Sequence, residues 1–371
     1  MPTISIEQKL LRQLLSRYGI EHDIEKMAHE LPLLGTDIDT CDEKTLDIEI
    51  FPDRPDLLSG ETLSKAIRPF LYGAKSEPEL DVKTGPVKMT VDSELEHIRP
   101  VILGAIVRSV ETGKSAEEKD EFIKALMDHQ EKLHFALGRG RRRASIGVHD
   151  LSKISPPFHV KAMPSSTSFS PLASTEEMTL DQILTSHPKG IDYAHLLRDM
   201  NAYPIIFDSN NQVLSFPPII NGNQTTVSHS TRDFFIDVTG WDRRACESSL
   251  MLIALQLAER GGRIESVEVT GFDGSVEHLP QSTPLEHQVT ERLLDGLLGR
   301  SLNDDEISAA INRMGGRYLG RNKASETTNS AVTKMSDIIE GDTVLRFAMP
   351  RWRFDILHPV DLVEDVAIGH G

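Results

Sequence analysis

The feature that most constrains the fold is the apolar stretch SSLMLIALQLAERGG, residues Ser248–Gly262. Its leucines recur at helical spacing, and the pair Gly261-Gly262 predicts the end of that helix. About 20 apolar residues are needed to cross a bilayer, and the apolar run here is shorter. We therefore expect a helix buried in a protein core, and no association of the chain with a membrane.

The length and composition are typical of a multidomain globular protein. The 371 residues suggest two or three domains, and 39% of them are hydrophobic. The net charge of −17 argues against a surface that binds nucleic acid everywhere, while leaving room for local basic patches. Cys41 and Cys246 are too few for a disulfide framework, which suits a reducing compartment. No signal peptide follows Met1, so we predict a cytoplasmic location.

Periodicity and composition divide the chain into the three expected domains of an α+β multidomain fold. Residues 1–88 predict a small N-terminal α/β domain that ends in the polar linker AKSEPELDVKTGPVK. Residues 89–275 predict a mixed α+β domain, and residues 280–371 a third domain of helices and strands. The expected helices cover Ser5–Tyr18, Ile24–Leu31, about 61–71 after a Ser59 cap, and the segments SAEEKDEFIKALMDHQEKLHFALG, TPLEHQVTERLLDGLLG and NDDEISAAINRMGG.

The closing stretch RWRFDILHPVDLVEDVAIGHG concentrates carboxylates beside apolar residues. Alternation in RWRFDIL predicts a strand that carries Asp355, and Pro359 suits the start of a helix. That helix places Asp361, Glu364 and Asp365 on one face, where like charges repel unless a cation binds them. An all-oxygen ligand set without cysteine favours Mg²⁺ over Zn²⁺. The alternatives are a helix-dipole role for Asp361 and an ordinary solvated acidic face.

The middle region places polar residues at turns and on one side of a strand. SFPPIING joins Ser215 to two prolines and an Asn-Gly turn, a stiff arrangement that can present backbone groups. Alternation in DFFIDVTG predicts that Asp237 and Thr239 point to the same side of a strand. A triad of Ser215, His229 and Asp237 is conceivable, but no spacing singles it out. The alternative is that these residues satisfy backbone groups at turns and strand ends.

The run GRGRRR, from Gly138 to Arg143, places four arginines in a turn. Such a turn can hold phosphates or the 3′ end of a tRNA, or it can be a solvated loop in an acidic protein. Its glycines do not form a phosphate-binding loop, because the pattern G-x4-G-K-[ST] is absent.

Several blocks together resemble the phenylalanyl-tRNA synthetase β subunit of the archaeal and eukaryotic branch, over nearly the whole chain. The closing stretch matches the signature that ends the family's middle domain. The other matching blocks are HIRPVILGAIVRSV, HQEKLHFALGRGRRRASIGVHDL, HPKGIDYAHLL, YPIIFDSNNQVLSFPPIINGNQTTV and TRDFFIDVTGWD. This resemblance assigns Asp355, Asp361, Glu364 and Asp365 to a Mg²⁺ site shared with the α subunit.

The resemblance also implies an editing pocket that hydrolyses tyrosine wrongly attached to the phenylalanine tRNA. A hydrophobic pocket rejects an analogue with one added hydroxyl by only about a hundredfold, so a second site that recognises the hydroxyl is needed. In this family resemblance Asp237 either orients the hydrolytic water or accepts the tyrosyl hydroxyl. The implied pocket residues are Ser215, Asp237 and Thr239, with Leu214 and Asn221 beside them and Arg139 and Arg141 contacting tRNA.

As partners, the resemblance implies the α subunit in an (αβ)2 heterotetramer, tRNA(Phe), phenylalanine and tyrosine, with ATP as a substrate of the holoenzyme. The family's β subunit continues into a catalytic-like domain beyond the closing signature, so these 371 residues alone are not expected to activate phenylalanine. Gly60 ahead of Glu61 and the bulky Trp241 depart from the family pattern. A non-catalytic scaffold that binds tRNA or a partner chain is the alternative function.

Overall fold

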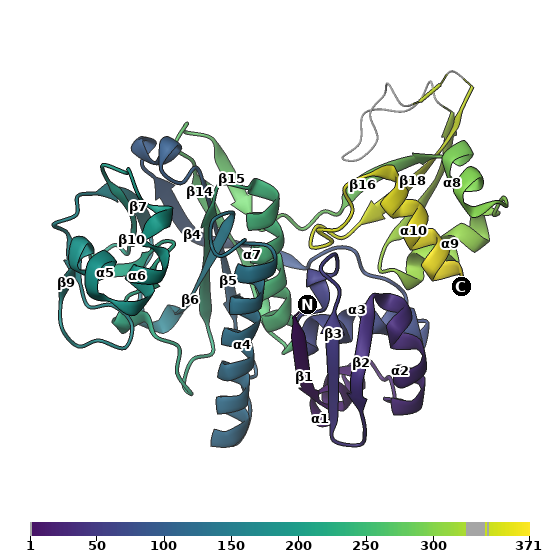
Figure 1. The fold of residues 1–371 in the computed structure, drawn as a ribbon, viewed down its shortest axis with the longest axis horizontal. Coiled ribbons are helices and arrows are strands. Elements are labelled where there is room, and N and C mark those ends of the chain that lie inside the picture. The colour runs from purple at the N-terminus through teal and green to yellow at the C-terminus, as the bar shows by residue number, and fades with distance from the viewer. Residues whose placement is uncertain (1, 324–337, 340) are drawn as a thin grey trace. The chain divides into compact units, whose positions relative to one another are not determined.

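The computed structural model describes residues 2–323, 338–339 and 341–371. The chain forms two compact units, one from Met1–Leu80 with Ser282–Gly371 and the other from Asp81–Gln281. It leaves the first unit once and returns to it, as the purple and yellow-green segments of Figure 1 show. Both units combine helices with sheets, in agreement with the expected α+β class.

The N-terminal part of the first unit is a small antiparallel sheet covered by helices. The strand order is β1-β3-β2, and Ile4 and Ile6 of β1 are buried. We expected a helix from Ser5, but pairing with β3 makes the first residues a strand and delays the helix to Gln8. Ser59 caps the third helix by accepting a hydrogen bond from the Thr62 amide, as predicted. The elements are β1 Thr3–Glu7, α1 Gln8–Ser16, α2 Ile24–Glu30, β2 Thr36–Cys41, β3 Thr45–Ile50 and α3 Gly60–Tyr72.

The C-terminal part of the first unit packs three helices against a sheet of order β16-β18-β17. The segment TPLEHQVTERLLDGLLG, expected as one helix, is a strand followed by a helix, because Leu285–Thr290 pairs with β18. The expected strand RWRFDIL was wrong: residues 351–357 form a turn followed by irregular backbone, in which Arg353 is buried. The elements are β16 Leu285–Thr290, α8 Glu291–Leu298, α9 Asp304–Arg313, β17 Arg317–Lys323, β18 Thr343–Met349 and α10 Pro359–His370.

The second unit is built on a ten-stranded sheet of order β12-β11-β10-β7-β4-β14-β5-β13-β6, with β15 beside β14. Its strands are β4 Val82–Val91, β5 Val101–Arg108, β6 Ala144–Asp150, β7 Phe158–Met163, β10 Tyr203–Phe207, β11 Val213–Phe216, β12 Ile220–Asn221, β13 Phe234–Gly240, β14 Arg263–Thr270 and β15 Val276–Leu279. The other elements are the pair β8 Ser168–Phe169 and β9 Met178–Thr179, and the helices α4 Ala116–Ala136, α5 Leu180–Ser186, α6 Pro188–Tyr193 and α7 Arg243–Glu259.

The linker expected to reach residue 88 is shorter than predicted. β4 pairs in parallel with β14, so this polar segment is already part of the sheet. Its polarity comes from one exposed side, where Lys88 and Thr90 lie, while Val87 and Met89 are buried. Alternation was therefore present in the segment, but its prolines and glycine suggested a loop.

The apolar stretch that opened the sequence analysis is confirmed as a buried helix. α7 packs against β5 and β13, and nearly all of its residues are buried. The long helix α4 is also confirmed, and a capping box of Ser115 and Glu118 fixes its start. Within the described part of the chain, no helix combines the length and apolar character needed to span a bilayer.

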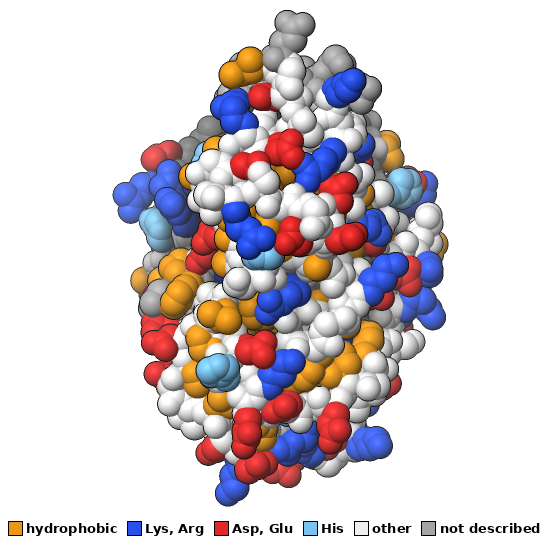
Figure 2. Space-filling view, turned by 90° about the vertical axis from the view of Figure 1, so that its right-hand side faces the viewer, with side chains coloured by type: hydrophobic (Ala, Val, Ile, Leu, Met, Phe, Trp, Pro, Cys, Tyr) orange, Lys and Arg blue, Asp and Glu red, His pale blue; other side chains and the backbone are white. Residues whose placement is uncertain are grey.

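Charged side chains of both signs share the surface. On the face seen in Figure 2, blue and red side chains are interspersed and apolar patches lie between them. The chain has a net charge of −17, but the described acidic side chains on this face do not form one continuous acidic surface.

Candidate functional site

The centre of β13 carries the polar residues that the sequence singled out. Asp237 pairs with Gly147 of β6 on one side and with Gly104 of β5 on the other. Phe235, Asp237 and Thr239 alternate with the rest of the strand and lie on one face. Gly147 leaves room beside the Asp237 carboxylate, because a Cβ there would lie 2.0 Å from Asp237 Oδ2.

His149 is the residue that holds the Asp237 carboxylate. Its Nε2 lies 2.7 Å from Asp237 Oδ2, and its Nδ1 lies 2.8 Å from Thr225 Oγ1. The ring is fully buried and stacks on Phe235 with centroids 5.8 Å apart. Among the described residues, no group donates a hydrogen bond to Asp237 Oδ1. One carboxylate oxygen is therefore fixed and the other is free.

Asp237 lines a cavity of about 290 Å³. Ser215 and Asn221 lie in its wall, as does the loop with Pro217 and Pro218. The apolar part of the wall comes from that loop, from α4 and from β6. Leu214, which we expected beside the pocket, is fully buried and is not part of the wall.

Thr239 faces a different group from the one expected. Arg99 donates from Nε to Thr239 Oγ1 at 2.7 Å and from Nη2 to Ser145 Oγ at 3.1 Å. Burial lowers the pKa of Arg99 to about 10, and the Thr239 carbonyl accepts a further bond from it at 2.8 Å. Thr239 thus belongs to a buried network behind Ser145 and does not line the cavity.

The arginine turn divides into an inner and an outer part. Arg141 is buried and donates to the carbonyls of Pro218 and Ile219 at 3.2 and 2.9 Å. It also bonds Glu131 at 2.7 Å, and a hydrogen bond from His134, together with the Arg141 charge, lowers the Glu131 pKa to about 2. Arg139 is exposed. Arg141 therefore braces the cavity loop, while Arg139 stays available at the surface.

The conceivable triad is not assembled. His229 is half-exposed and pairs with Asp120 at 2.5 Å. His149 lies beside Asp237 instead, and the sequence analysis missed it. A period of two in SIGVHD places Gly147 and His149 on one strand face, which is the signal that was available.

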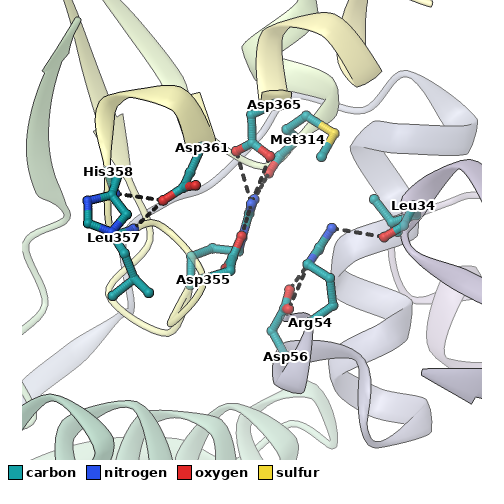
Figure 3. A network of polar contacts seen from close by, with 10 residues as sticks. Leu34, Arg54, Asp56, Met314, Asp355, Leu357, His358, Asp361 and Asp365 are labelled. Carbon is teal, nitrogen blue, oxygen red and sulfur yellow. Dashed lines mark hydrogen bonds and ion pairs between the residues drawn. The ribbon is translucent and has the colours of Figure 1, made fainter. Parts of the chain in front are cut away.

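Two carboxylates of the closing stretch, Asp355 and Asp365, bind an arginine. Arg353 Nε lies 2.8 Å from Asp355 Oδ1, and its Nη2 lies 2.8 Å from Asp365 Oδ1 (Figure 3). Burial raises the pKa of Asp365 to about 6, although the Arg353 charge opposes this. Burial acts likewise on Asp355, but there the charge and hydrogen bonds of Arg353 dominate and lower the pKa.

The two remaining carboxylates of the signature do not join this cluster. Asp361 accepts hydrogen bonds from the amides of Leu357 and His358, both at 2.6 Å, at the start of α10. Figure 3 shows dashed lines joining the Asp361 carboxylate to Leu357 and His358. Glu364 is exposed. Among the described residues, no group of three or more His, Cys, Asp or Glu side chains is arranged to hold a metal ion.

The predicted Mg²⁺ site therefore does not fit this arrangement of the four carboxylates. A guanidinium already neutralises two of them, and a third caps its own helix. Next to Arg353, Arg54 forms a second buried pair with Asp56 at 2.8 Å and donates to the Leu34 carbonyl (Figure 3). The cluster is thus a set of internal ion pairs within the first unit.

Comparison with known proteins places this geometry in a family. Residues 99–269 match the model of the B3/4 domain, and residues 288–371 match the model of the tRNA synthetase B5 domain. A solved N-terminal fragment of the phenylalanyl-tRNA synthetase β-subunit from Pyrococcus horikoshii is 32% identical, with a TM-score of 0.84 and full coverage of both chains. The chain belongs to the phenylalanyl-tRNA synthetase β-subunit family.

Curated relatives support this membership. The phenylalanine–tRNA ligase β subunits of Methanococcoides burtonii and Archaeoglobus fulgidus are 40% and 38% identical over the whole of this chain. The chain spans 63% and 62% of their lengths. The resemblance to the synthetase β subunit drawn from the sequence is thereby confirmed.

The two departures from the family pattern have limited effect on the described structure. Gly60 is the first residue of α3, and the Ser59 cap keeps the helix start in place. Trp241 is about half exposed and does not line the cavity around Asp237. The B3/4 match covers the sheet that carries Asp237, and the B5 match covers the part that carries Arg353.

Proposed function

We propose that this chain serves in phenylalanyl-tRNA synthesis as part of a phenylalanine–tRNA ligase β subunit and hydrolyses tyrosine from Tyr-tRNA(Phe). ATP-dependent charging would belong to the α subunit, with which the chain would assemble in an (αβ)2 heterotetramer. The observation that carries the editing proposal is the buried Asp237 carboxylate, which faces a cavity of about 290 Å³ with one oxygen free. A buried carboxylate in the wall of a largely apolar pocket suits a binding or catalytic site.

The free oxygen of Asp237 supplies recognition of the tyrosyl hydroxyl. A phenolic hydroxyl donates to Oδ1 of the carboxylate, whereas a phenyl ring leaves this oxygen without a hydrogen-bond partner. Leaving a buried acceptor unpaired costs about 1–3 kcal/mol, and more for a charge. The site therefore favours tyrosine over phenylalanine, which is the reverse of the preference needed in a synthetic site.

The tRNA would approach the exposed part of the arginine turn. Arg139 and Arg142 are exposed, and their cations suit phosphate oxygens near the aminoacylated end. Arg141 acts indirectly by holding the carbonyls of Pro218 and Ile219 in the cavity wall. We derive no step through Mg²⁺, because the carboxylates predicted to bind it are engaged with Arg353 and with the start of α10.

The test is deacylation of Tyr-tRNA(Phe) by the 371-residue chain. We expect release of tyrosine by the parent and a loss of about a hundredfold or more in Asp237→Ala. Asp120→Ala is the matched control, because that carboxylate is exposed and pairs with His229 on the surface. Its rate should equal that of the parent.

If the parent is inactive, the α subunit is added and the assay is repeated. Activity that returns with the α subunit and again depends on Asp237 supports the editing proposal. Continued absence of release would contradict it and would favour a scaffold that binds tRNA or a partner chain without hydrolysis.

A further inference from the structure

We propose that His149 is a positioning residue that aims the Asp237 carboxylate into the cavity, and that Gly147 provides the space for this pair. This inference rests on the proposed editing function and extends it. His149 itself does not line the cavity, so its action on a bound tyrosyl group passes through Asp237.

The hydrogen bonds determine which carboxylate oxygen is available. An ionised carboxylate only accepts, so His149 Nε2 donates to Asp237 Oδ2 across 2.7 Å. Thr225 Oγ1, 2.8 Å from Nδ1, fixes the other side of the ring. Rotation of the imidazole would break both bonds at once. The carboxylate is thus held with Oδ1 left for a ligand.

The packing of the ring also limits its movement. His149 lies directly opposite Phe235 in the β6–β13 ladder, and the two rings are nearly parallel at an interplanar angle of 26°. The side chain of His149 is fully buried. A ring so enclosed keeps its orientation, which is the property that a positioning residue needs.

Gly147 is the part of the arrangement that polar contacts alone do not reveal. A Cβ at this position would lie 2.0 Å from Asp237 Oδ2 and 2.8 Å from His149 Nε2. The φ angle of Gly147 is not in the left-handed region, so backbone conformation does not demand glycine. The space beside the His149–Asp237 pair is what requires it.

Gly104 provides a matched comparison on the other side of Asp237. It pairs with the same residue of β13, yet the three atoms nearest to a Cβ there would belong to Met89, Phe235 and Val267, at 3.2, 3.3 and 3.6 Å, and none to the carboxylate. A methyl group at Gly104 therefore changes apolar packing, while one at Gly147 displaces the Asp237–His149 pair.

The experiment measures single-turnover deacylation of Tyr-tRNA(Phe) and Phe-tRNA(Phe) by the parent and five variants, Asp237→Ala included, each checked for folding by circular dichroism. His149→Leu removes the donor, and His149→Gln places an amide donor near Nε2. We expect the ratio of tyrosine to phenylalanine release to fall about tenfold or more in His149→Leu and to recover to within about threefold of the parent in His149→Gln. A purely structural histidine gives no such recovery in selectivity.

The glycine variants keep the test informative if His149→Leu fails to fold. Gly147→Ala should lower the same ratio by about tenfold or more, and Gly104→Ala should leave it unchanged within about threefold. Parent-like selectivity in both His149→Leu and Gly147→Ala, with Asp237→Ala inactive, overturns this inference alone. A parent that releases neither amino acid, even with the α subunit, overturns the editing function and this inference with it.

Discussion

Asp237 and Asp365 are both buried carboxylates with a basic partner, but their partners leave them in different chemical states. His149 contacts one oxygen of Asp237, and the other accepts no hydrogen bond from the described residues. Asp237 lines a cavity. Arg353 bonds both oxygens of Asp365 and both oxygens of Asp355. The first carboxylate can still accept a hydrogen bond from a ligand, whereas the second pair is already saturated by a guanidinium.

The difference shows that a pattern of acidic residues does not determine what neutralises them. The closing signature has the spacing of a cation site, and a cation is indeed present, but it is the side chain of Arg353. In the B3/4 domain the partner is an imidazole, which has only one nitrogen to offer to the carboxylate, so a binding function remains open.

The largest effect is expected from removal of the internal cation. Arg353→Met leaves Asp355 and Asp365 buried without a partner, which should lower the free energy of unfolding by about 3–5 kcal/mol. Urea unfolding followed by Trp352 fluorescence in a Trp241→Phe background measures the first unit, because Trp352 is buried there. The triple variant Arg353→Met, Asp355→Asn, Asp365→Asn is the control and should regain most of the loss. A cost below about 1 kcal/mol for the single variant would contradict the ion-pair interpretation.

The effect of pH on the free energy of unfolding, through the same cluster, should be smaller than the effect of Arg353→Met, and its sign can be predicted. The raised pKa of Asp365, about 6, means that the folded chain holds a proton that the unfolded chain has released between about pH 4 and 6. This group therefore makes the folded state less stable as the pH rises through that range, on the order of 1–3 kcal/mol. The unfolding free energy of the parent minus that of Asp365→Asn should therefore decrease as the pH rises from about 4 to about 6. A difference that rises with pH would assign the opposite shift to Asp365.

The same comparison between the two regions can be made with their buried arginines, Arg353 and Arg141. Arg353 holds carboxylates, while Arg141 holds two carbonyls of the cavity loop. Arg141→Met should slow Tyr-tRNA(Phe) deacylation about tenfold, because the loop loses its fixed position. Arg139→Met is the exposed counterpart on the same turn and should act mainly on the apparent affinity for tRNA, more so at low salt. Equal effects of both variants on the maximal rate would contradict the separate roles.

The smallest effect is expected from Mg²⁺. With Arg353 in place, the folded chain should not bind Mg²⁺ at these carboxylates, and a ligand stabilises only a state that binds it. The melting temperature should therefore differ by no more than about 1 °C between millimolar MgCl₂ and EDTA. Differential scanning fluorimetry measures this. A rise of several degrees with Mg²⁺, lost in Asp365→Asn, would show that the carboxylates exchange Arg353 for the metal.

The sequence predicted the local features of the fold better than the long-range ones. The buried helix α7, the Ser59 cap and the shared face of Asp237 and Thr239 follow from periodicity within a few residues. The prediction of a strand over RWRFDIL was wrong. Alternation of apolar and polar residues assumes that Arg353 is exposed, whereas Arg353 is buried among its ion pairs.

The candidate site was only partly accessible from the sequence. Ser215, Asn221 and Asp237, predicted as pocket residues, line one cavity, but the sequence did not indicate the partner of Asp237. His149 and Asp237 are 88 residues apart, and only the register of β6 on β13 brings them together. Periodicity gives the face of each strand but does not say which strands are neighbours. The same limit concealed the role of Gly147.

The most direct test of the central claim is the ratio of tyrosine to phenylalanine release from tRNA(Phe), measured for the parent and for Asp237→Asn. If the free oxygen of Asp237 accepts a hydrogen bond from the tyrosyl hydroxyl, the parent should release tyrosine at least about tenfold faster than phenylalanine. Asp237→Asn should bring the two rates close together. Equal rates in the parent, or a preference for tyrosine that survives in Asp237→Asn, would contradict the account.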